Sequence, residues 1–478
     1  MPTVLAIDAG TTGVRSRLVL HDGTTAASAY REFTQYFPQP GWVEHDAEEI
    51  WNAVVETISE VIARTGTTPT AIGITNQRET VVAWSRASGL PLHRAIVWQD
   101  RRTAKHCKQL APYLDIVRST TGLVLDPYFS GTKIAWLINE GFVTVNNDLA
   151  VGTIDSWLIW NLTGGKVHAT DPSNASRTML FDINEMQWSP DLCAMIGVPI
   201  NALPTVMPSS GVFGFSSAPQ VIAGGIPIAG VVGDQQAALF GQACFSPGQT
   251  KNTYGTGSFV LMNVGTRCPP PVEGMLTTVA WDLGNGPTYA LEGSIFITGA
   301  AVQWLRDGLK IIERSDQFEE LAMSVADNGG VYFVPAFAGL GSPWWNADAR
   351  GAIFGITRGT TRAHLARATL ESMVFQTRDV VEAMNSAAGI QITELRVDGG
   401  GAVMDSMLQM QADHLGVPVI RPRDREITAL GAAYLAGLAT GVWQNTTEIA
   451  DNWHLDRTFP PTNDPVGYEG WLEAIRRL

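Results

Sequence analysis

The chain has 478 residues, of which 45% are hydrophobic and 16% charged, and its formal net charge at pH 7 is −14. This length predicts about two to four domains, and the composition is that of an ordinary globular protein. The acidic balance argues against a nucleic-acid-binding surface, and because no run of about 18 apolar residues occurs, we expect no membrane span.

Strand-like and helix-like runs alternate along the chain, which is typical of an α/β architecture. The first residues lack the basic start and apolar core of a secretory signal. The four cysteines are far apart and lack the spacing of metal ligands, so we expect reduced thiols and a cytoplasmic protein. These residues are Cys107, Cys193, Cys244 and Cys268.

Two strand-like runs near the start, residues 4–7 and 17–20, flank the turn DAGTTG. A Walker loop needs Lys followed by Ser or Thr, and a dinucleotide fingerprint opens a helix, whereas here a second strand follows. Glycines let the backbone approach a ligand, and the amides and hydroxyls of Thr11 and Thr12 can surround phosphate oxygens. Asp8 would repel a bare phosphate, so we expect a divalent cation between them. A hairpin with no ligand explains this stretch equally well.

A helix is expected after Asp46, which is placed to cap it. Its apolar residues recur at helical spacing, so this stripe is predicted to pack into the core and not to recognise a ligand. The residues of the stripe are Trp51, Val54, Val55, Ile58, Val61 and Ile62.

The polar run NQRE at residues 76–79 lies between two predicted strands, residues 71–74 and 80–84. Neighbours in a regular strand point to opposite faces, so Arg78 and Glu79 can serve one site only if the chain bends there. The planar donors of Arg and the two oxygens of Glu then match vicinal hydroxyls of a small polyol. From these residues alone, a surface ion pair in a loop is the favoured alternative.

Another apolar strand ends at VVGDQQ, where Asp234 precedes an Ala-rich helix. Asp at such a junction is most often an N-cap, and local physics favours that interpretation by about two to one. Alternatively, Asp234 faces a cleft and accepts the proton of a substrate hydroxyl, as the catalytic Asp of phosphoryl transfer does.

The segment NTYGTGSFVLMNVG, residues 252–265, repeats the pattern of strand, Gly-Thr turn and strand. Gly255 and Thr256 correspond to Gly10 and Thr11, so two related domains are predicted to face each other across a nucleotide. A third turn, RVDGGGAVMDSML, follows a strand and opens a helix, where backbone amides suit the same nucleotide.

Taken together, the motifs resemble those of the FGGY carbohydrate kinases and, among them, the glycerol kinases. The resemblance runs from the first strand to EITALGAAYLAGLATGVWQN. It implies an α/β, actin-like (ribonuclease H-like) duplicated two-domain fold with a central catalytic cleft. Residues 1–246 would hold the acceptor site and the first phosphate turn, and residues 247–478 would bind the nucleotide. The most specific segments are GWVEHD, TNQRET, AIVWQDRRT, LDPYFSGTKIAWL, GTIDSWLIWNLTGG, SNASRTMLF, GDQQAALFGQ, KNTYGTGSF, GLGSPWW and RGAIFGITRGTTRAHLARATLESM.

The resemblance also implies the activity: transfer of the γ-phosphate of ATP, with Mg²⁺, to a terminal hydroxyl of glycerol. The products would be sn-glycerol 3-phosphate and ADP. One alternative is a kinase of the same family acting on erythritol, xylulose, dihydroxyacetone or another small polyol or ketose. Another is a non-catalytic nucleotide switch of the actin or chaperone kind, which would have no use for the acceptor residues.

The site residues follow from the resemblance, position by position. Asp234 would be the catalytic base and, with Asp8, would hold the metal. The acceptor would lie among Arg78, Glu79, Trp98, Tyr128, Asp234, Gln235 and Phe259. The nucleotide would lie among Thr11, Thr12, Gly13, Arg15, Thr256, Gly299, Gln303, Gly400 and Met404.

Three departures from the glycerol kinase pattern concern the nucleotide and regulation. Ala9 and Gly13 replace a Gln and a Ser in the first turn, which removes one hydroxyl contact to phosphate. Met404 replaces an Asn beside the adenine, so selectivity for ATP is expected to weaken. Gly224 and Gly225 stand where members inhibited by fructose 1,6-bisphosphate carry an Arg, so no such inhibition is expected.

Two further expectations concern packing and assembly. The Ala- and Gly-rich helix around residues 429–438 is expected to pack closely, either near a hinge or simply in the core. Members of the family often form dimers or tetramers, so the resemblance implies a homodimer or homotetramer.

Overall fold

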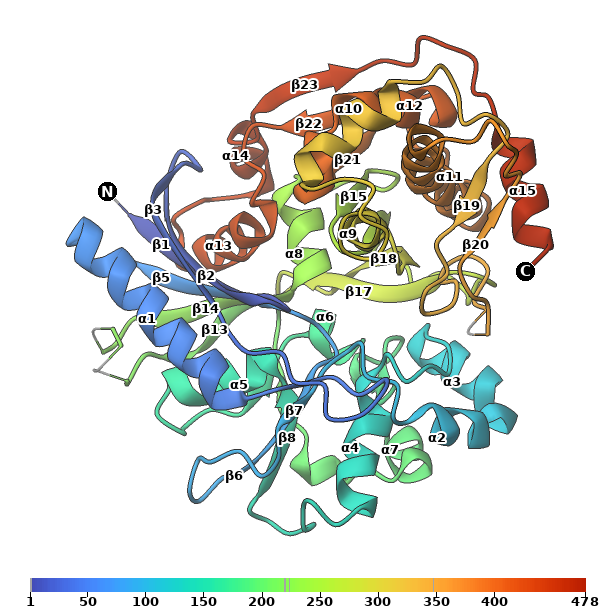
Figure 1. Cartoon of the computed structure of the whole chain (residues 1–478). Helices are drawn as coiled ribbons and strands as arrows, with labels where there is room; N and C mark the ends of the chain where they lie inside the picture. Colours follow the sequence, from blue (N-terminus) through green and yellow to red (C-terminus); the bar gives the residue numbers. More distant parts are fainter. Residues whose placement is uncertain (1, 219–220, 223, 347) are drawn as a thin grey trace.

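The computed structural model describes residues 2–218, 221–222, 224–346 and 348–478. Its framework is a pair of large mixed sheets, one in each half of the chain (Figure 1). The first has the order β13 (Ser210–Phe215), β14 (Pro227–Gly233), β5 (Ala71–Asn76), β1 (Thr3–Ala9), β2 (Gly13–Leu20) and β3 (Thr25–Glu32). The second has the order β17 (Leu276–Asp282), β18 (Pro287–Ile295), β16 (Ser258–Gly265), β15 (Thr250–Tyr254), β21 (Leu395–Asp398), β22 (Val419–Pro422) and β23 (Leu455–Phe459).

The two sheets repeat one strand pattern. In the first, β1, β2 and β3 form an antiparallel run, and β1 also pairs in parallel with β5, which pairs in parallel with β14. In the second, β15, β16 and β18 form the antiparallel run, and β15, β21 and β22 the parallel one. The two phosphate-type turns, between β1 and β2 and between β15 and β16, therefore occupy equivalent places. The predicted α/β duplication is confirmed.

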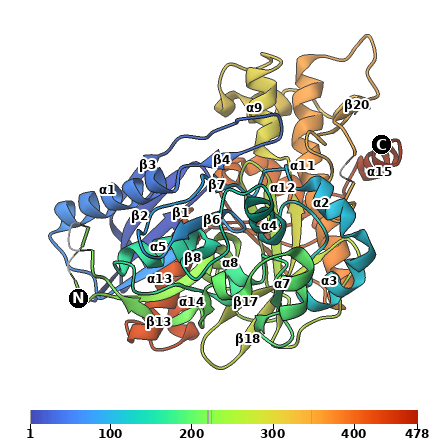
Figure 2. The same cartoon turned by 90° about the horizontal axis from the view of Figure 1, so that it is seen from below.

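The side chains of β1 alternate between the two faces of the first sheet and pack into a different cluster on each. Leu5 and Ile7 pack with α1 (Ala47–Thr65) and α5 (Ile154–Leu162), whereas Val4 and Ala6 belong to a separate cluster on the other face. Because side chains alternate with a period of two, Asp8 shares the face of Val4 and Ala6. Figure 2 places α1 with β2 and β3 on one side of the molecule and α9 and α11 on the other.

The predicted cap of α1 is confirmed. Asp46 is the N-cap residue, and its carboxylate accepts the amide of Glu48 at 2.9 Å. The apolar stripe of this helix packs into the core as expected, with Val54, Ile58 and Val61 fully buried.

Helices α8 (Asp234–Gly241) and α13 (Ile427–Thr440) form a layer between the two sheets, in the middle of Figure 1. Their apolar residues share one cluster with residues of both sheets. The contact is so close that a Cβ on Gly431 would collide with the carbonyl of Ala237. Close packing of α13 is thus confirmed, and it lies against the first sheet although it comes late in the chain. Its part in a hinge, and the division at residue 246, stay predictions.

Smaller elements complete the two halves. A four-stranded sheet in the lower part of Figure 1 has the order β4 (Glu44–His45), β7 (Ala95–Ile96), β6 (Val81–Ser85) and β8 (Leu149–Thr153). The remaining helices of the first half are α2 (Ala104–Gln109), α3 (Leu114–Thr121), α4 (Ser130–Asn139), α6 (Pro172–Ala175) and α7 (Pro190–Ile196). Beside the second sheet lie α9 (Gly299–Asp307), α10 (Phe318–Met323), α11 (Arg362–Ala388), α12 (Asp405–Leu415), α14 (Thr446–Asp451) and α15 (Tyr468–Arg476). The short strands are β9 (Ala169–Thr170), β10 (Phe181–Asp182), β11 (Gln187–Trp188), β12 (Thr205–Val206), β19 (Tyr332–Val334) and β20 (Ala352–Phe354).

Two expectations about cysteines and membranes can be compared with this fold. All four cysteines are free thiols, three of them buried. Within the described ranges, no helix combines the length and the apolar character needed to cross a membrane.

Candidate active site

Two cavities lie side by side, one lined by residues of both halves of the chain and the other by residues of the second half. The first, the Arg78 cavity, has a volume of about 430 Å³ and contains Arg78, Glu79 and Asp234 in its lining. The second, the Met404 cavity, has a volume of about 600 Å³. Gly255, Thr256 and Gln303 line both, so the cavities meet at the turn between β15 and β16. Of the predicted site residues, the Arg78 cavity also contains Thr11, Thr12, Trp98, Tyr128, Gln235 and Phe259, and the Met404 cavity also contains Gly299, Gly400 and Met404.

A bend after β5 brings Arg78 and Glu79 to the same site. Glu79 has a φ of 61°, in the left-handed region, and the amide of Thr80 donates to the carbonyl of Arg78 at 2.7 Å. Arg78 is only 2% exposed and Glu79 only 1%. The surface ion pair favoured by these residues alone is therefore wrong, because the bend turns both side chains inward.

Arg78 contacts two side chains that line its cavity, Asp234 and Tyr128, and one that does not, Gln236. Its Nε lies 3.2 Å from Oδ1 of Asp234, and its Nη2 donates to the Tyr128 hydroxyl at 3.2 Å. Its Nη1 donates to Oε1 of Gln236 at 3.2 Å. A fully buried guanidinium held in this way presents fixed donors to a ligand.

Asp234 is not the N-cap of α8, which corrects the interpretation that local physics favoured. Gly233 takes that position, and Asp234 is the first residue of the helix. Its Oδ1 accepts the amide of Gln235 at 2.7 Å, and 26% of its side chain remains exposed, towards the Arg78 cavity. Burial raises the pKa of Asp234, while Arg78 and Lys251 oppose the rise. A carboxylate in this setting can accept a proton from a bound hydroxyl.

Aromatic rings form an apolar wall of the same cavity. Trp98 makes edge contacts with Tyr128 and Phe259, at centroid distances of 5.6 Å and 6.3 Å. Its Nε1 donates to Oγ1 of Thr11 at 3.0 Å, so the wall is joined to the first turn. The carbon backbone of a small polyol would suit such a wall.

Lys251 is a component of the site that the sequence analysis missed. Its Nζ donates to Oε1 of Gln235 at 2.5 Å, to Oγ1 of Thr253 at 2.9 Å and to the carbonyl of Phe259 at 3.2 Å. Burial lowers the pKa of this ammonium to about 8. The signal in the sequence that could have identified Lys251 is its position as a charged residue inside the buried strand β15.

Two further charged residues were missed, Arg177 and Glu292. Both are fully buried, and each is paired with the acceptor-site residues Arg78 or Glu79. Arg177 lies in the segment SNASRTMLF and Glu292 in the strand β18, where it interrupts the apolar sequence ALEGSI. Isolated charges in apolar strands are the signal that could have found Glu292, since such groups need buried partners.

The two phosphate-type turns present free backbone donors. One backbone hydrogen bond spans each turn. In the first turn the amide of Gly10 donates to the carbonyl of Gly13 at 3.0 Å, and in the second the amide of Gly255 donates to the carbonyl of Gly257 at 2.8 Å. The amides of Thr11, Thr12 and Thr256 have no hydrogen-bond partner in the part of the chain that the structure describes. Successive free amides of this kind form anion-binding concavities.

Helix α9 holds the second turn in place. The amide of Gly299 donates to the carbonyl of Gly255 at 3.1 Å, and that of Ala300 to the carbonyl of Thr256 at 3.0 Å. A Cβ on Gly299 would lie only 2.5 Å from the carbonyl oxygen of Gly255, so this approach requires glycine.

Gly13 and Arg15, also predicted at the phosphates, line neither cavity. A Cβ on Gly13 would lie 2.5 Å from the carbonyl oxygen of Arg31 and 2.6 Å from the hydroxyl of Tyr30, so this backbone leaves no room for a side chain. Arg15 pairs with Glu426 at 3.2 Å and stacks on Tyr30 at 5.0 Å. Their contact with a nucleotide stays a prediction.

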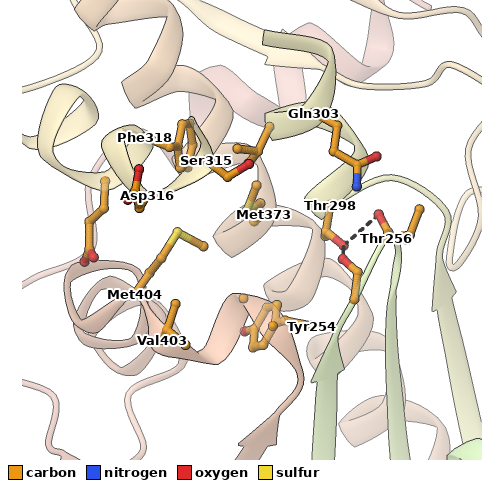
Figure 3. A pocket seen from close by; sticks show the side chains of 16 residues that line it. Tyr254, Thr256, Thr298, Gln303, Ser315, Asp316, Phe318, Met373, Val403 and Met404 are labelled. Carbon is orange, nitrogen blue, oxygen red and sulfur yellow. Dashed lines mark hydrogen bonds between the residues drawn. The ribbon is translucent and has the colours of Figure 1, made fainter. Parts of the chain in front are cut away.

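The Met404 cavity is mainly apolar (Figure 3). Tyr254, Phe318, Met373 and Met404 surround a space of the size needed for a planar base, and Ser315 and Asp316 add polar groups at one side. The third predicted turn is confirmed here, since β21 leads through a 3₁₀ turn (Gly400–Val403) into α12. No amide side chain replaces the missing Asn at position 404 among the lining residues except Gln303, across the cavity.

The predicted metal position fits a hard divalent cation. Burial, and repulsion by Asp234 and Glu426, raise the pKa of Asp8 to about 7. Among the described residues, no three His, Cys, Asp or Glu side chains converge as metal ligands. Magnesium in kinases needs only one or two carboxylates together with substrate phosphates, and a magnesium site at Asp8 and Asp234 stays a prediction.

The chain belongs to the FGGY family of carbohydrate kinases. The model of the N-terminal domain of this family matches residues 3–241, and that of the C-terminal domain matches residues 250–440. The matches cover the two halves that carry the duplicated sheets.

Among its relatives are two bacterial enzymes that match along almost their whole length. The glycerol kinase of Symbiobacterium thermophilum is 54% identical over 487 residues, which covers 99% of this chain and 98% of that protein. Glycerol kinase 2 of Thermotoga maritima is 53% identical over 490 residues, covering 100% and 99%.

Solved structures agree with the fold. Plasmodium falciparum glycerol kinase with ADP has a TM-score of 0.90 at 34% identity, covering 100% of this chain and 98% of that one. A ligand-bound xylulose kinase of Lactobacillus acidophilus has the same TM-score and coverage at 21% identity. The second match bears on the fold alone.

Proposed function

We propose that this protein is an ATP-dependent kinase that transfers the γ-phosphate to a terminal hydroxyl of glycerol and forms sn-glycerol 3-phosphate and ADP. The observation that carries the proposal is the meeting of the two cavities beside Asp234. Relatives more than half identical over almost the full chain are glycerol kinases, which supports glycerol as the acceptor. The ADP-bound relative supports ATP as the donor.

The acceptor would lie in the Arg78 cavity, with its hydroxyls on Arg78, Glu79, Tyr128 and Gln235. Its carbon backbone would pack against the aromatic wall. Most of a triol is hydroxyl, so convergent polar groups bind it well and reject analogues that leave them unpaired.

The transfer itself follows from this placement. The attacking oxygen bonds to the γ-phosphorus while the bond from that phosphorus to the bridging oxygen breaks, and ADP leaves. The proton of the hydroxyl passes to the carboxylate of Asp234. In a loose transition state, orientation of the hydroxyl by Asp234 and Arg78 contributes as much as its deprotonation.

The free amides of Thr11, Thr12 and Thr256 would bind the phosphates from both sides. Thr11 is fixed by its bond from Trp98, so the acceptor wall and the phosphate turn are held in one geometry. Magnesium held by Asp8 and Asp234 would neutralise charge on the triphosphate. The base would occupy the Met404 cavity, where apolar contacts replace the missing amide.

Two further parts of the proposal concern the cellular setting. Free cysteines and the use of ATP support a cytoplasmic protein. Assembly into a homodimer or homotetramer is proposed by analogy with the family.

A substrate panel tests the proposal. ADP release from Mg²⁺-ATP is measured with glycerol, dihydroxyacetone, erythritol, xylulose and no acceptor. We expect glycerol to exceed every other acceptor in kcat/KM. Preference for xylulose or erythritol would favour the other kinases of the family, and equal release without an acceptor would contradict the whole assignment.

A further inference from the structure

We propose that Glu292, on β18 of the second half of the chain, is a positioning residue of the acceptor site that orients Arg78 directly and Glu79 through Arg177. The inference rests on the proposed function, because it concerns the site that would bind the polyol.

A two-point contact joins Glu292 to Arg78. Oε1 of Glu292 accepts from Nη2 of Arg78 at 3.1 Å, and Oε2 accepts from Nη1. A carboxylate that meets a guanidinium at two points fixes its plane as well as its position. With both terminal nitrogens held, Nε of Arg78 is directed to Asp234, 3.2 Å away.

Glu292 also acts on Glu79, through Arg177. Nη2 of Arg177 donates to Oε1 of Glu292 at 2.9 Å, and Nε of Arg177 donates to Oε1 of Glu79 at 2.7 Å. The hydroxyl of Ser294 also donates to Oε1 of Glu292, at 3.1 Å. Glu292, in the second half of the chain, thus fixes Arg78 directly and Glu79 through Arg177, the two charged residues of the first half that are predicted to bind the acceptor.

Glu292 itself does not reach the substrate space. It is fully buried and absent from the lining of both cavities. Although burial opposes it, the pKa of Glu292 falls to about 2 because Arg177 and Arg78 stabilise its charge. Its effect on a ligand must therefore pass through Arg78, Arg177 and Glu79.

The test compares the parent enzyme with Glu292→Gln. The amide keeps the shape but directs a donor at an arginine, so we expect the KM for glycerol to rise about tenfold or more. The KM for ATP is expected to stay within about twofold, because no contact of Glu292 reaches the Met404 cavity.

Two variants separate positioning from general damage. Glu292→Asp keeps the charge that Arg78 and Arg177 contact, so its KM for glycerol is expected to lie between those of Glu292→Gln and the parent. Glu371→Gln is the matched control, since Glu371 is also a buried carboxylate paired with an arginine, Arg367, at 2.7 Å, and lines neither cavity. It should leave the KM for glycerol and the KM for ATP unchanged.

Each other outcome overturns a defined claim. An unchanged KM for glycerol in Glu292→Gln would refute the positioning role. A uniform loss of kcat with no selective change for glycerol would refute it as well, because simple structural damage explains that result. A parent enzyme inactive towards glycerol would overturn the proposed function together with this inference.

Discussion

Substitution of Asp234 by Asn is expected to slow phosphate transfer about 100-fold or more while nucleotide binding is kept. Asn has nearly the same shape, so Gln235 can still donate its amide to the side-chain oxygen as it does at 2.7 Å in the parent. The basic group for the hydroxyl proton is lost, and so is the negative partner of Arg78.

The expected size follows from the position of the side chain. A loss of about 100-fold corresponds to about 2.7 kcal/mol in the barrier, within the range for removal of a general base. The ion pair with Arg78 spans 3.2 Å, and Arg78 keeps its pairing with Glu292 in the variant, so loss of this pair is expected to change stability little. The KM for glycerol is expected to change less than kcat.

The assay is a coupled measurement of ADP formation, with ADP binding followed separately by calorimetry. Asp307→Asn is the control, because Asp307 is an exposed partner of Arg306 at the end of α9. An Asp234→Asn variant with unchanged turnover would remove Asp234 from the mechanism. Loss of ADP binding in parallel with turnover would instead indicate a damaged cleft.

Four further predictions address packing, base selection, pH and inhibition by fructose 1,6-bisphosphate. Gly431→Ala is expected to lower the free energy of unfolding by about 2 kcal/mol in chemical denaturation, because its Cβ would collide with the carbonyl of Ala237. Gly359→Ala, which meets no such obstacle, should leave the free energy of unfolding unchanged. Equal stability of the two variants would contradict the close packing. Met404→Asn is expected to lower the KM for ATP relative to that for GTP, and an unchanged ratio would show that base selection lies elsewhere. In EDTA, the pKa of Asp8 is about 7 in the folded protein, against an ordinary value of 3.8. The contribution of Asp8 to the free energy of unfolding is therefore expected to be full below about pH 4 and to be lost as the pH rises through 7. Thermal unfolding of Asp8→Asn should show a flatter decline over this range, and a decline as steep as in the parent would refute the pKa assignment. Millimolar fructose 1,6-bisphosphate should leave the rate unchanged, and a saturable fall would show that Gly224 and Gly225 do not remove inhibition.

Local signals predicted the framework well. The Gly-Thr turns, the strands on either side of them and the cap at Asp46 are specified by neighbouring residues, because turns, caps and strand alternation depend on short-range physics. The duplicated sheets followed from the resemblance of the two turns, since equivalent hairpins need equivalent surroundings.

Predictions failed where the outcome depends on distant residues. Local rules favoured a cap at Asp234 and a surface pair at Arg78 and Glu79, but α8 is covered by the second sheet and α13, which turns these groups into a buried cleft. Glu292 was missed because its partners are 214 and 115 residues away in the chain. Charges of this kind are recognised only when the fold brings their partners together.

The central claim is that a hydroxyl bound beside Asp234 receives the γ-phosphate directly. The most direct test counts products by phosphorus NMR after reaction with Mg²⁺-ATP and glycerol. One sn-glycerol 3-phosphate for each ADP, with little inorganic phosphate, is the result this structure predicts. ADP and inorganic phosphate formed equally with and without glycerol would contradict it.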